Sequence, residues 1–277
     1  MTLEPLHIPA LLRKFGISPQ KSLGQNFLVD HNALKKIVQE AGVAPGDDVL
    51  EIGAGVGNLT RMLAVQARSV TAVELDRKLL PVLAEVTHPF ENVRIINEDI
   101  LAVDTGDLFS DPDYLVVANI PYYITSAVIR HLLESAAKPA RIALTIQREV
   151  AERIVSRDEK MSLLSLSVQI YGSPRIAAHI PADCFYPPPK IDSSLLLIDV
   201  DRQPELAPEE ISRLFRLAHA AFNQKRKMLR NSLKPVLGQD AARVLAAIDA
   251  GGIDPRRRPE SLALEEWVDI VNIVGKV

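Results

Sequence analysis

The segment 115–126, LVVANIPYYITS, carries the residues of this 277-residue chain that are best suited to chemistry. An apolar run typical of a buried strand ends at Asn119, and Pro121 cannot donate to a strand ladder, so the strand must stop there. The side-chain oxygen of Asn119 and a carbonyl of Ile120 or Pro121 could accept the two N–H bonds of an aromatic amine. Tyr122 offers a flat face on which the ring of that amine could stack.

This set of groups suits methyl transfer to the amine of a nucleobase. The lone pair of such an amine is delocalised into the ring, so the nitrogen is a weak nucleophile that must be desolvated and aimed at the methyl group. No strong base is needed if the proton leaves after the transfer. The base must leave its helical stack before it can reach such a pocket.

A glycine-rich loop, EIGAGVGNLT at 51–60, forms the second candidate site. Glu74, which ends the next apolar run, could accept both hydroxyls of a ribose, and Asp99 follows the third run. Up to this point a dinucleotide dehydrogenase would fit nearly as well. Three glycines let the loop turn tightly and approach a ligand: Gly53, Gly55 and Gly57.

The spacing of these glycines favours a different cofactor. The pattern is G-x-G-x-G with Glu51 ahead of it, whereas a diphosphate-binding loop has G-x-G-x-x-G at a helix start. A carboxylate in this place would repel a diphosphate, but it suits a cofactor with an amino acid and a cationic sulfonium. The loop therefore indicates an S-adenosylmethionine site, and the alternative is that its glycines only form a turn.

Alternating segments predict the scaffold that positions both sites. Asp30 can cap a helix that ends at Gly42. Strand–helix alternation predicts right-handed βαβ units, and hence an α/β fold with a doubly wound, mostly parallel sheet. Strands are expected over 48–52, 69–75, 93–96, 115–118, 141–147, 162–172 and 193–200, and helices over 58–67, 76–86, 124–136 and 148–156.

The pattern changes near residue 205, after the linker-like segment DRQPELAPEE. Two apolar stripes at helical spacing follow, and they predict a small, all-helical domain. We therefore expect a Rossmann-like domain over 1–204 and a helical domain over 205–277. The stripes contain Ile211, Leu214, Phe215, Ala218 and Phe222, and then Leu264, Trp267, Val268 and Val271.

Composition restricts the class of protein. Cys184 is the single cysteine and the six histidines lack metal-ligand spacing, so neither a disulfide nor a metal site is expected. No apolar run approaches the roughly 18 residues that span a bilayer, and the first residues lack a signal-peptide pattern, which predicts a cytoplasmic protein. The net charge is −3, with the acidic excess in the middle and both ends basic, so local patches could still hold a polyanion.

Taken together, the motifs resemble those of the bacterial small-subunit (16S) ribosomal RNA adenine dimethyltransferases. Asn-Ile-Pro-Tyr is similar to the Asn/Asp-Pro-Pro-Tyr motifs of amino methyltransferases. Each match is weak in isolation, but their order and gaps are specific, and they extend nearly end to end. The matching segments are KSLGQNFLVD, EIGAGVGNLT, AVELD, EDIL, NIPYYITS, FYPPPKIDSSL and FNQKRKMLRNSL.

The resemblance implies a function and a set of site residues. The reaction would be two methyl transfers to each of two adjacent adenosines near the 3′ end of 16S RNA, within a small ribosomal subunit or its precursor. S-adenosylmethionine would be the cofactor, and a monomer is the default state. The cofactor would contact Gln25, Asn26, Leu28, Gly53, Glu74, Asp99, Ile100 and Asn119, while Asn119, Pro121 and Tyr122 would hold the target base, with Phe185 stacked opposite Tyr122.

A basic run follows the second domain's first apolar stripe, and it includes Lys225. If helical, four of its residues share about a third of the helix circumference. A solvated face is the ordinary explanation of such a run, but the acidic body favours contact with RNA phosphates. The four are Arg226, Lys227, Arg230 and Lys234. For the three arginines at 256–258, both contact with RNA and a solvated surface remain open.

Other interpretations remain at this stage. Position 120 is isoleucine where leucine is commoner in this family, and Asn-Ile-Pro-Tyr also occurs in 23S RNA methyltransferases. The segments KRKMLRNSL and RRRPESLALEEW favour the 16S branch. A 23S RNA or DNA adenine methyltransferase, an RNA-binding assembly factor without turnover, and a dehydrogenase are the alternatives. For Phe185 a pocket role is favoured over a core anchor, for Tyr186 the reverse, and Cys184 is expected to be a packing residue.

Overall fold

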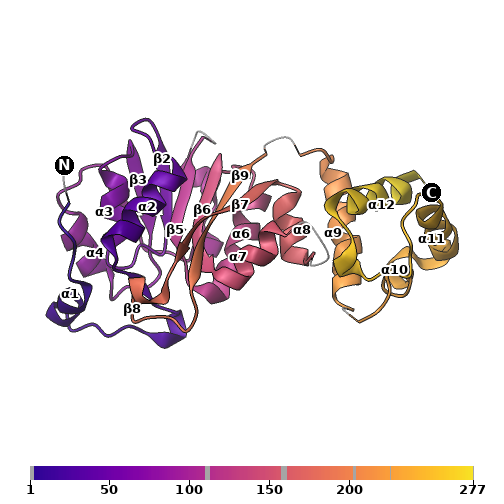
Figure 1. The fold of residues 1–277 in the computed structure, drawn as a ribbon. Coiled ribbons are helices and arrows are strands. Elements are labelled where there is room, and N and C mark those ends of the chain that lie inside the picture. The colour runs from indigo at the N-terminus through magenta and orange to yellow at the C-terminus, as the bar shows by residue number, and fades with distance from the viewer. Residues whose placement is uncertain (1–2, 110–112, 157–160, 202–203, 225, 277) are drawn as a thin grey trace. The chain divides into compact units, whose positions relative to one another are not determined.

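The computed structural model describes residues 3–109, 113–156, 161–201, 204–224 and 226–276. The chain divides into two compact units (Figure 1). The larger consists of Met1–Ala151 and Ser173–Arg202, and the smaller of Glu152–Gly172 and Gln203–Val277. The third crossing between the units, after residue 202, falls close to the boundary near residue 205 that the sequence predicts. The segment 152–172 departs from that prediction, because it lies within the expected first domain and packs with the smaller unit.

The larger unit is built on a seven-stranded sheet in the order β4-β3-β2-β5-β6-β9-β7. β2, β3, β4, β5 and β6 run parallel, and β9 is antiparallel to β6. The short strands β1 and β8 form a separate antiparallel pair. The bounds are β1 (Phe27–Leu28), β2 (Asp48–Ile52), β3 (Ser69–Val73), β4 (Val93–Ile96), β5 (Leu115–Asn119), β6 (Arg141–Gln147), β7 (Gly172–Ile180), β8 (Phe185–Tyr186) and β9 (Ser193–Val200).

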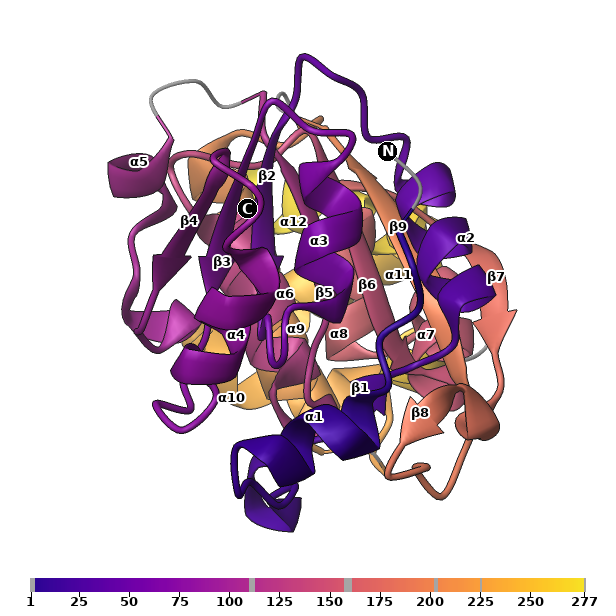
Figure 2. The same ribbon diagram turned by 90° about the vertical axis from the view of Figure 1, so that its left-hand side faces the viewer.

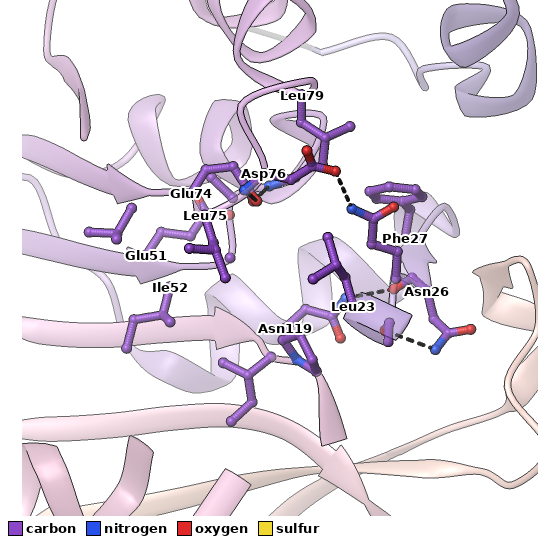
Figure 3. A pocket seen from close by; sticks show the side chains of 18 of the residues that line it. Leu23, Asn26, Phe27, Glu51, Ile52, Glu74, Leu75, Asp76, Leu79 and Asn119 are labelled. Carbon is purple, nitrogen blue, oxygen red and sulfur yellow. Dashed lines mark hydrogen bonds between the residues drawn. The ribbon is translucent and has the colours of Figure 1, made fainter. Parts of the chain in front are cut away.

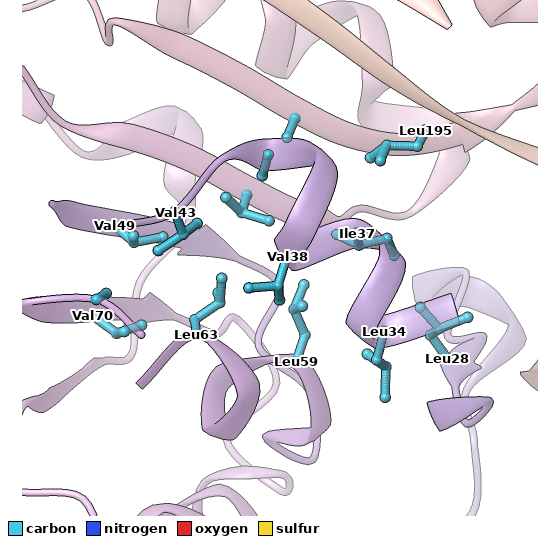
Figure 4. Close-up of a cluster of buried hydrophobic side chains, with 14 of the residues drawn as sticks. Leu28, Leu34, Ile37, Val38, Val43, Val49, Leu59, Leu63, Val70 and Leu195 are labelled. Atoms are coloured by element: carbon cyan, nitrogen blue, oxygen red, sulfur yellow. The ribbon is translucent and has the colours of Figure 1, made fainter. Parts of the chain in front are cut away.

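Both faces of the sheet are buried. Successive strand residues point to opposite faces, and Val49 and Leu50 are each 0% exposed. The helices α2 and α3 pack against the face that carries Val49, Val70 and Leu195 (Figure 4), and α6 lies on the other side (Figures 1 and 2). This confirms the predicted doubly wound sheet. The helices are α1 (Ile8–Lys14), α2 (His31–Ala41), α3 (Asn58–Ala64), α4 (Leu80–Thr87), α5 (Thr105–Leu108), α6 (Thr125–Glu134) and α7 (Arg148–Val155).

The strand order places the pocket. From β2 the chain first adds β3 and β4 on one side, and then crosses over to add β5 and β6 on the other. The carboxyl ends of β2 and β5 therefore lie at a topological switch point, where open α/β sheets bind ligands. The glycine loop follows β2, and Asn119 is the last residue of β5.

The smaller unit is helical, as the apolar stripes predict. Trp267 is completely buried and its ring centroid lies 5.6 Å from that of Phe222, so the two stripes meet in one core. No helix of the described residues is long and apolar enough to cross a membrane. The helices are α8 (Leu163–Gln169), α9 (Pro208–Phe222), α10 (Leu229–Leu237), α11 (Ala241–Ala250) and α12 (Leu264–Lys276).

The strand expected over 162–172 is wrong, because most of this segment forms α8. The hydroxyl of Ser162 accepts the backbone N–H of Ser165 and so caps the helix. Buried hydroxyls inside α8 donate to backbone carbonyls, with Ser167 Oγ 2.7 Å from the oxygen of Leu163. The alternation of leucine and serine suggests a half-buried strand, but these bonds let a helix bury its serines, and Ser165 Oγ donates to the carbonyl of Arg153 at 2.7 Å.

Candidate active site

A pocket lies at the carboxyl ends of β2, β3 and β5 (Figure 3). Its lining comes from Leu34 and from five stretches of the larger unit, within 23–28, 51–59, 73–79, 98–100 and 119–124. The two motifs that the sequence singles out, the glycine loop and NIPYY, therefore share one cavity. All the predicted cofactor residues line it, and so do three of the four predicted catalytic residues.

The glycine loop brings the backbone close to the cavity. Gly55 has a φ of +61°, and a Cβ atom there would lie 3.2 Å from the ring of Phe27. A side chain would thus be strained in conformation and crowded in space. The N–H of Gly55 donates to Glu74 Oε2 at 2.7 Å, which fixes the loop to the end of β3. The glycine is needed for this close approach and is not merely a turn residue.

Glu74 is a buried acceptor at the edge of the pocket. Its Oε1 accepts the N–H of Asp76 at 2.8 Å and its Oε2 accepts that of Gly55. Burial raises the pKa of Glu74. Each carboxylate oxygen has two lone pairs, so both can still accept a ribose hydroxyl. Asp99 Oδ1 accepts the N–H of Leu101 at 3.0 Å, while the side chain of Ile100 is buried against the same cavity.

Glu51, the carboxylate that the sequence places ahead of the glycine loop, lies in the cofactor site. It is 2% exposed, it lines the pocket, and its Oε2 has no hydrogen-bond partner among the described residues. Burial, opposed by the neighbouring Thr60 hydroxyl and assisted by the negative charge of Glu74, raises the pKa of Glu51 to about 8. An unpartnered carboxylate oxygen suits a cationic donor. The residues therefore fit a cofactor with an ammonium group, in which Glu51 would accept the ammonium and Glu74 the ribose.

Asn119 is held in one orientation. Its Nδ2 donates to the backbone oxygen of Asn26 at 3.0 Å (Figure 3). Because the nitrogen is engaged, the side-chain oxygen is the group left to accept a hydrogen bond from a ligand. The carbonyl of Pro121 already accepts the N–H of Ile124 at 3.2 Å. The Ile120 carbonyl is thus the better second acceptor for an amine.

Two tyrosines follow these acceptors. The Tyr122 hydroxyl lies 2.7 Å from Ser193 Oγ on β9, which anchors the ring, and burial raises the pKa of this hydroxyl. Tyr123, for which no role was predicted, lines the pocket and is 62% exposed. Its position directly after Asn-Ile-Pro-Tyr could have suggested a place in the pocket, but the exposure of its ring depends on the fold.

Phe185 is not brought to the pocket. Its side chain is 3% exposed, it pairs in register with Leu28, and it packs in the core cluster of the sheet's α2 face. With no exposed ring face, Phe185 is a core residue in this structure and not the predicted stacking partner of Tyr122. Tyr186 packs on the cluster around Ile8, and Cys184 packs on the cluster that contains Phe185, both as the core interpretation expects.

The predicted basic helix face is interrupted. Arg226 and Lys227 lie in the turn between α9 and α10, whereas Arg230 and Lys234 lie on α10. Lys225 lies outside the described residues. The side chains of the four described residues are exposed, and within the described part of the chain none forms an ion pair. They remain available to an anionic partner, but two of them lie in a turn and two on a helix instead of on one continuous helix face.

The three arginines of 256–258 differ from one another. Arg256 pairs with Asp254, its Nε 3.0 Å from Oδ1, and Arg257 pairs with Glu266. The carbonyl of Arg257 accepts the N–H of Leu229 at 2.8 Å, so this loop covers the start of α10. Two of the three arginines therefore form ion pairs within the smaller unit, whereas the side chain of Arg258 is exposed.

The fold and this pocket define a Rossmann-like methyltransferase domain of the S-adenosylmethionine-dependent class. A family model described as ribosomal RNA adenine dimethylase matches residues 17–276. Ribosomal RNA small subunit methyltransferase A of Moorella thermoacetica is 42% identical over 272 residues, 94% of each chain, and that of Bacillus pumilus is 38% identical over 98% and 97%. The chain belongs to the ribosomal RNA adenine dimethylase family.

Two solved structures resemble the whole fold. The 23S rRNA methyltransferase ErmE has a TM-score of 0.73 and 27% identity, with 90% of this chain and 100% of that chain covered. A dimethyladenosine transferase from Plasmodium falciparum has a TM-score of 0.77 and 23% identity, with 90% and 98% covered. At 23% identity, the likeness to the Plasmodium falciparum structure supports only the fold.

Proposed function

We propose that this chain transfers methyl groups from S-adenosylmethionine to N6 of two adjacent adenosines near the 3′ end of 16S ribosomal RNA. The product would be N6,N6-dimethyladenosine, formed during assembly of the small subunit in the cytoplasm, with the enzyme acting as a monomer. The observation that carries the proposal is the carboxamide of Asn119. Its nitrogen is held by Asn26, and its oxygen is left to accept an N–H bond of the target amine.

The site orients the amine and supplies no strong base. Asn119 Oδ1 and the Ile120 carbonyl accept the two N–H bonds, and Tyr122 stacks on the base, so that the nitrogen lone pair faces the methyl group. The bound cofactor supplies a methyl group activated by a sulfonium. After the methyl group passes to the nitrogen, the cofactor would leave as a neutral thioether and the amine would lose its proton to solvent. A second round on the same nitrogen gives the dimethylated base.

The family and the relatives support the target more strongly than the pocket does. The relatives named ribosomal RNA small subunit methyltransferase A align over almost the whole chain, including the smaller unit. The likeness to the 23S rRNA methyltransferase ErmE keeps that RNA as the second candidate substrate. Both candidates share the pocket chemistry and differ only in which RNA delivers the adenosine.

The experiment that tests the proposal uses methyl-labelled S-adenosylmethionine and unmethylated small ribosomal subunits, followed by digestion of the RNA and identification of the nucleosides. Labelled N6,N6-dimethyladenosine from 16S RNA is the expected result. Label on 23S RNA or DNA alone would keep the chemistry and overturn the target. Cofactor binding without label in any nucleic acid would overturn the enzymatic proposal in favour of a binding factor.

Reversing the charges of Arg226 and Arg230 is expected to weaken RNA binding and flatten its salt dependence. Each phosphate contact that is lost lowers the slope of log K against log salt by about 0.7–0.9. The measurement is the Kd at several salt concentrations between about 50 and 200 mM. The control is Arg243→Glu, an exposed arginine on α11. Unchanged affinity and slope in the double variant would show that these side chains form only a solvated surface.

A further inference from the structure

Asp76 connects the pocket to the segment of chain that covers it. The residue is 9% exposed and lies in the segment that follows β3, two residues beyond Glu74. Its Oδ2 accepts two carboxamide N–H bonds, from Gln20 Nε2 at 3.0 Å and from Gln25 Nε2 at 2.8 Å. Its Oδ1 accepts the backbone N–H of Lys78 at 3.0 Å. The sequence predicts Gln25 as a cofactor contact, but the structure shows its side chain bound to this carboxylate.

The segment 20–25 is closed on itself and rests on the NIPYY motif. Gln25 Oε1 accepts the backbone N–H of Gln20 at 2.8 Å, and the N–H of Gln25 donates back to the Gln20 carbonyl. Gly24 has a φ of +61°, and a Cβ atom there would lie 3.2 Å from that of Pro121. We call the segment 20–25 the cover loop. It touches the pocket wall closely and cannot shift without changing its contacts to Pro121.

The cover loop leads directly into the group that orients Asn119. Asn26 is the next residue along the chain, and its carbonyl accepts the N–H of Asn119 Nδ2. Figure 3 shows the two contacts, the one at Asp76 and the one at Asn119, on either side of this segment. The position of one carbonyl thus depends on a carboxylate 50 residues further along the chain (76 − 26).

We propose that Asp76 is a positioning residue for methyl transfer. Through Gln20 and Gln25 it holds the cover loop, and thereby the Asn26 carbonyl that keeps the oxygen of Asn119 directed at the target amine. This inference rests on the proposed function, in which that oxygen accepts the amine. Two carboxamide nitrogens converge on one atom, so the atom must accept two hydrogen bonds, and a carboxylate oxygen does this best.

The test exchanges the carboxylate of Asp76 and the carboxamide of Gln25. Asp76→Asn places a carboxamide among carboxamides, so donors face donors, and Gln25→Glu places two carboxylates in contact. Each single variant is expected to lower the single-turnover rate of methyl transfer about 10–100-fold, because small misplacements of a reacting group have effects of that size. The affinity for S-adenosylmethionine should change less than the rate. The double variant restores one carboxylate and one carboxamide, and its rate is expected to recover to within about fivefold of the starting protein.

A matched control is available on the same part of the chain. Lys14 Nζ lies 2.6 Å from Glu85 Oε1, with both side chains exposed. This pair also joins the first residues to another part of the larger unit, but away from the pocket. Glu85→Gln should leave the rate unchanged, since exposed ion pairs contribute little. Unchanged rates in both single variants would overturn the inference. So would two slow single variants whose combination is no faster.

Amide hydrogen exchange of the cover loop and of Asn26 separates this inference from the proposed function. Exchange should accelerate in each single variant and slow again in the double variant, whether or not an RNA substrate has been found. If the starting protein methylates no RNA, the proposed function fails and exchange alone judges the role of Asp76. If the starting protein is active and exchange does not respond to the substitutions, the positioning role fails and the proposed function stands.

Discussion

Asn119→Ala is expected to reduce the rate of methyl transfer at least about 10²–10³-fold, the loss seen when one preorganised polar group is removed from an active site. The affinity for S-adenosylmethionine should change by less than about tenfold, because Glu51 and Glu74, which are proposed to hold it, are unchanged. The effect is large because the substitution removes an acceptor for the target amine and also the donor to the Asn26 carbonyl. The measurement is a single-turnover rate beside a cofactor Kd.

Thr145→Val provides the control for damage at this edge of the sheet. Thr145 pairs in register with Asn119 and is completely buried, and its hydroxyl has no hydrogen-bond partner among the described residues. Valine keeps the shape and removes only that hydroxyl, so transfer should continue at the normal rate. A near-normal rate in Asn119→Ala would mean that another group orients the amine, and equal losses in both variants would indicate a general effect on the strand ends.

The strands of the sheet were the most predictable part of the fold. The expected bounds of β2, β4, β6 and β9 agree with the structure. For β2, β6 and β9 the reason is that strands covered on both faces appear as short apolar runs. α8 was mispredicted since its serines satisfy their hydroxyls inside a helix, which an alternating pattern does not reveal. The same error assigned 152–172 to the first domain, because membership of a unit depends on packing that the sequence order does not show.

The candidate site was predictable where position along a strand decides it. Gly53, Glu74 and Asn119 follow or end parallel strands, and the switch point brings such residues to one edge. Side-chain partners were not predictable in this way. Gln25 binds Asp76, which is 51 residues away in the sequence, and Phe185 faces the core because β8 pairs with β1. Residues at strand ends were therefore found. Gln25 also lines the pocket as expected, but its bond to Asp76 and the burial of Phe185 arise from tertiary contacts that the sequence does not show.

Raising the pH from about 5 to about 8 is expected to destabilise the ligand-free protein through Glu51. Its pKa is about 8 in the folded state against a usual value of 4.5. Between these values the unfolded chain releases the proton while the folded protein retains it, so the free energy of unfolding falls as the pH rises. The shift corresponds to about 5 kcal/mol as an upper limit. Denaturant unfolding at a series of pH values measures the change.

Glu51→Gln isolates this contribution, because glutamine has the same shape and stays neutral. The stability of the starting protein minus that of the variant should fall between about pH 4.5 and pH 8 and be level outside that window. A difference that is constant throughout would show that Glu51 is ionised in the folded protein.

The starting protein and Glu51→Gln together also test the cofactor site. The positive charges of bound S-adenosylmethionine favour ionised Glu51, so binding near pH 7 should release a proton from the starting protein and fewer from the variant. Calorimetry in two buffers of different ionisation enthalpy measures that release, and equal release would remove Glu51 from the cofactor site.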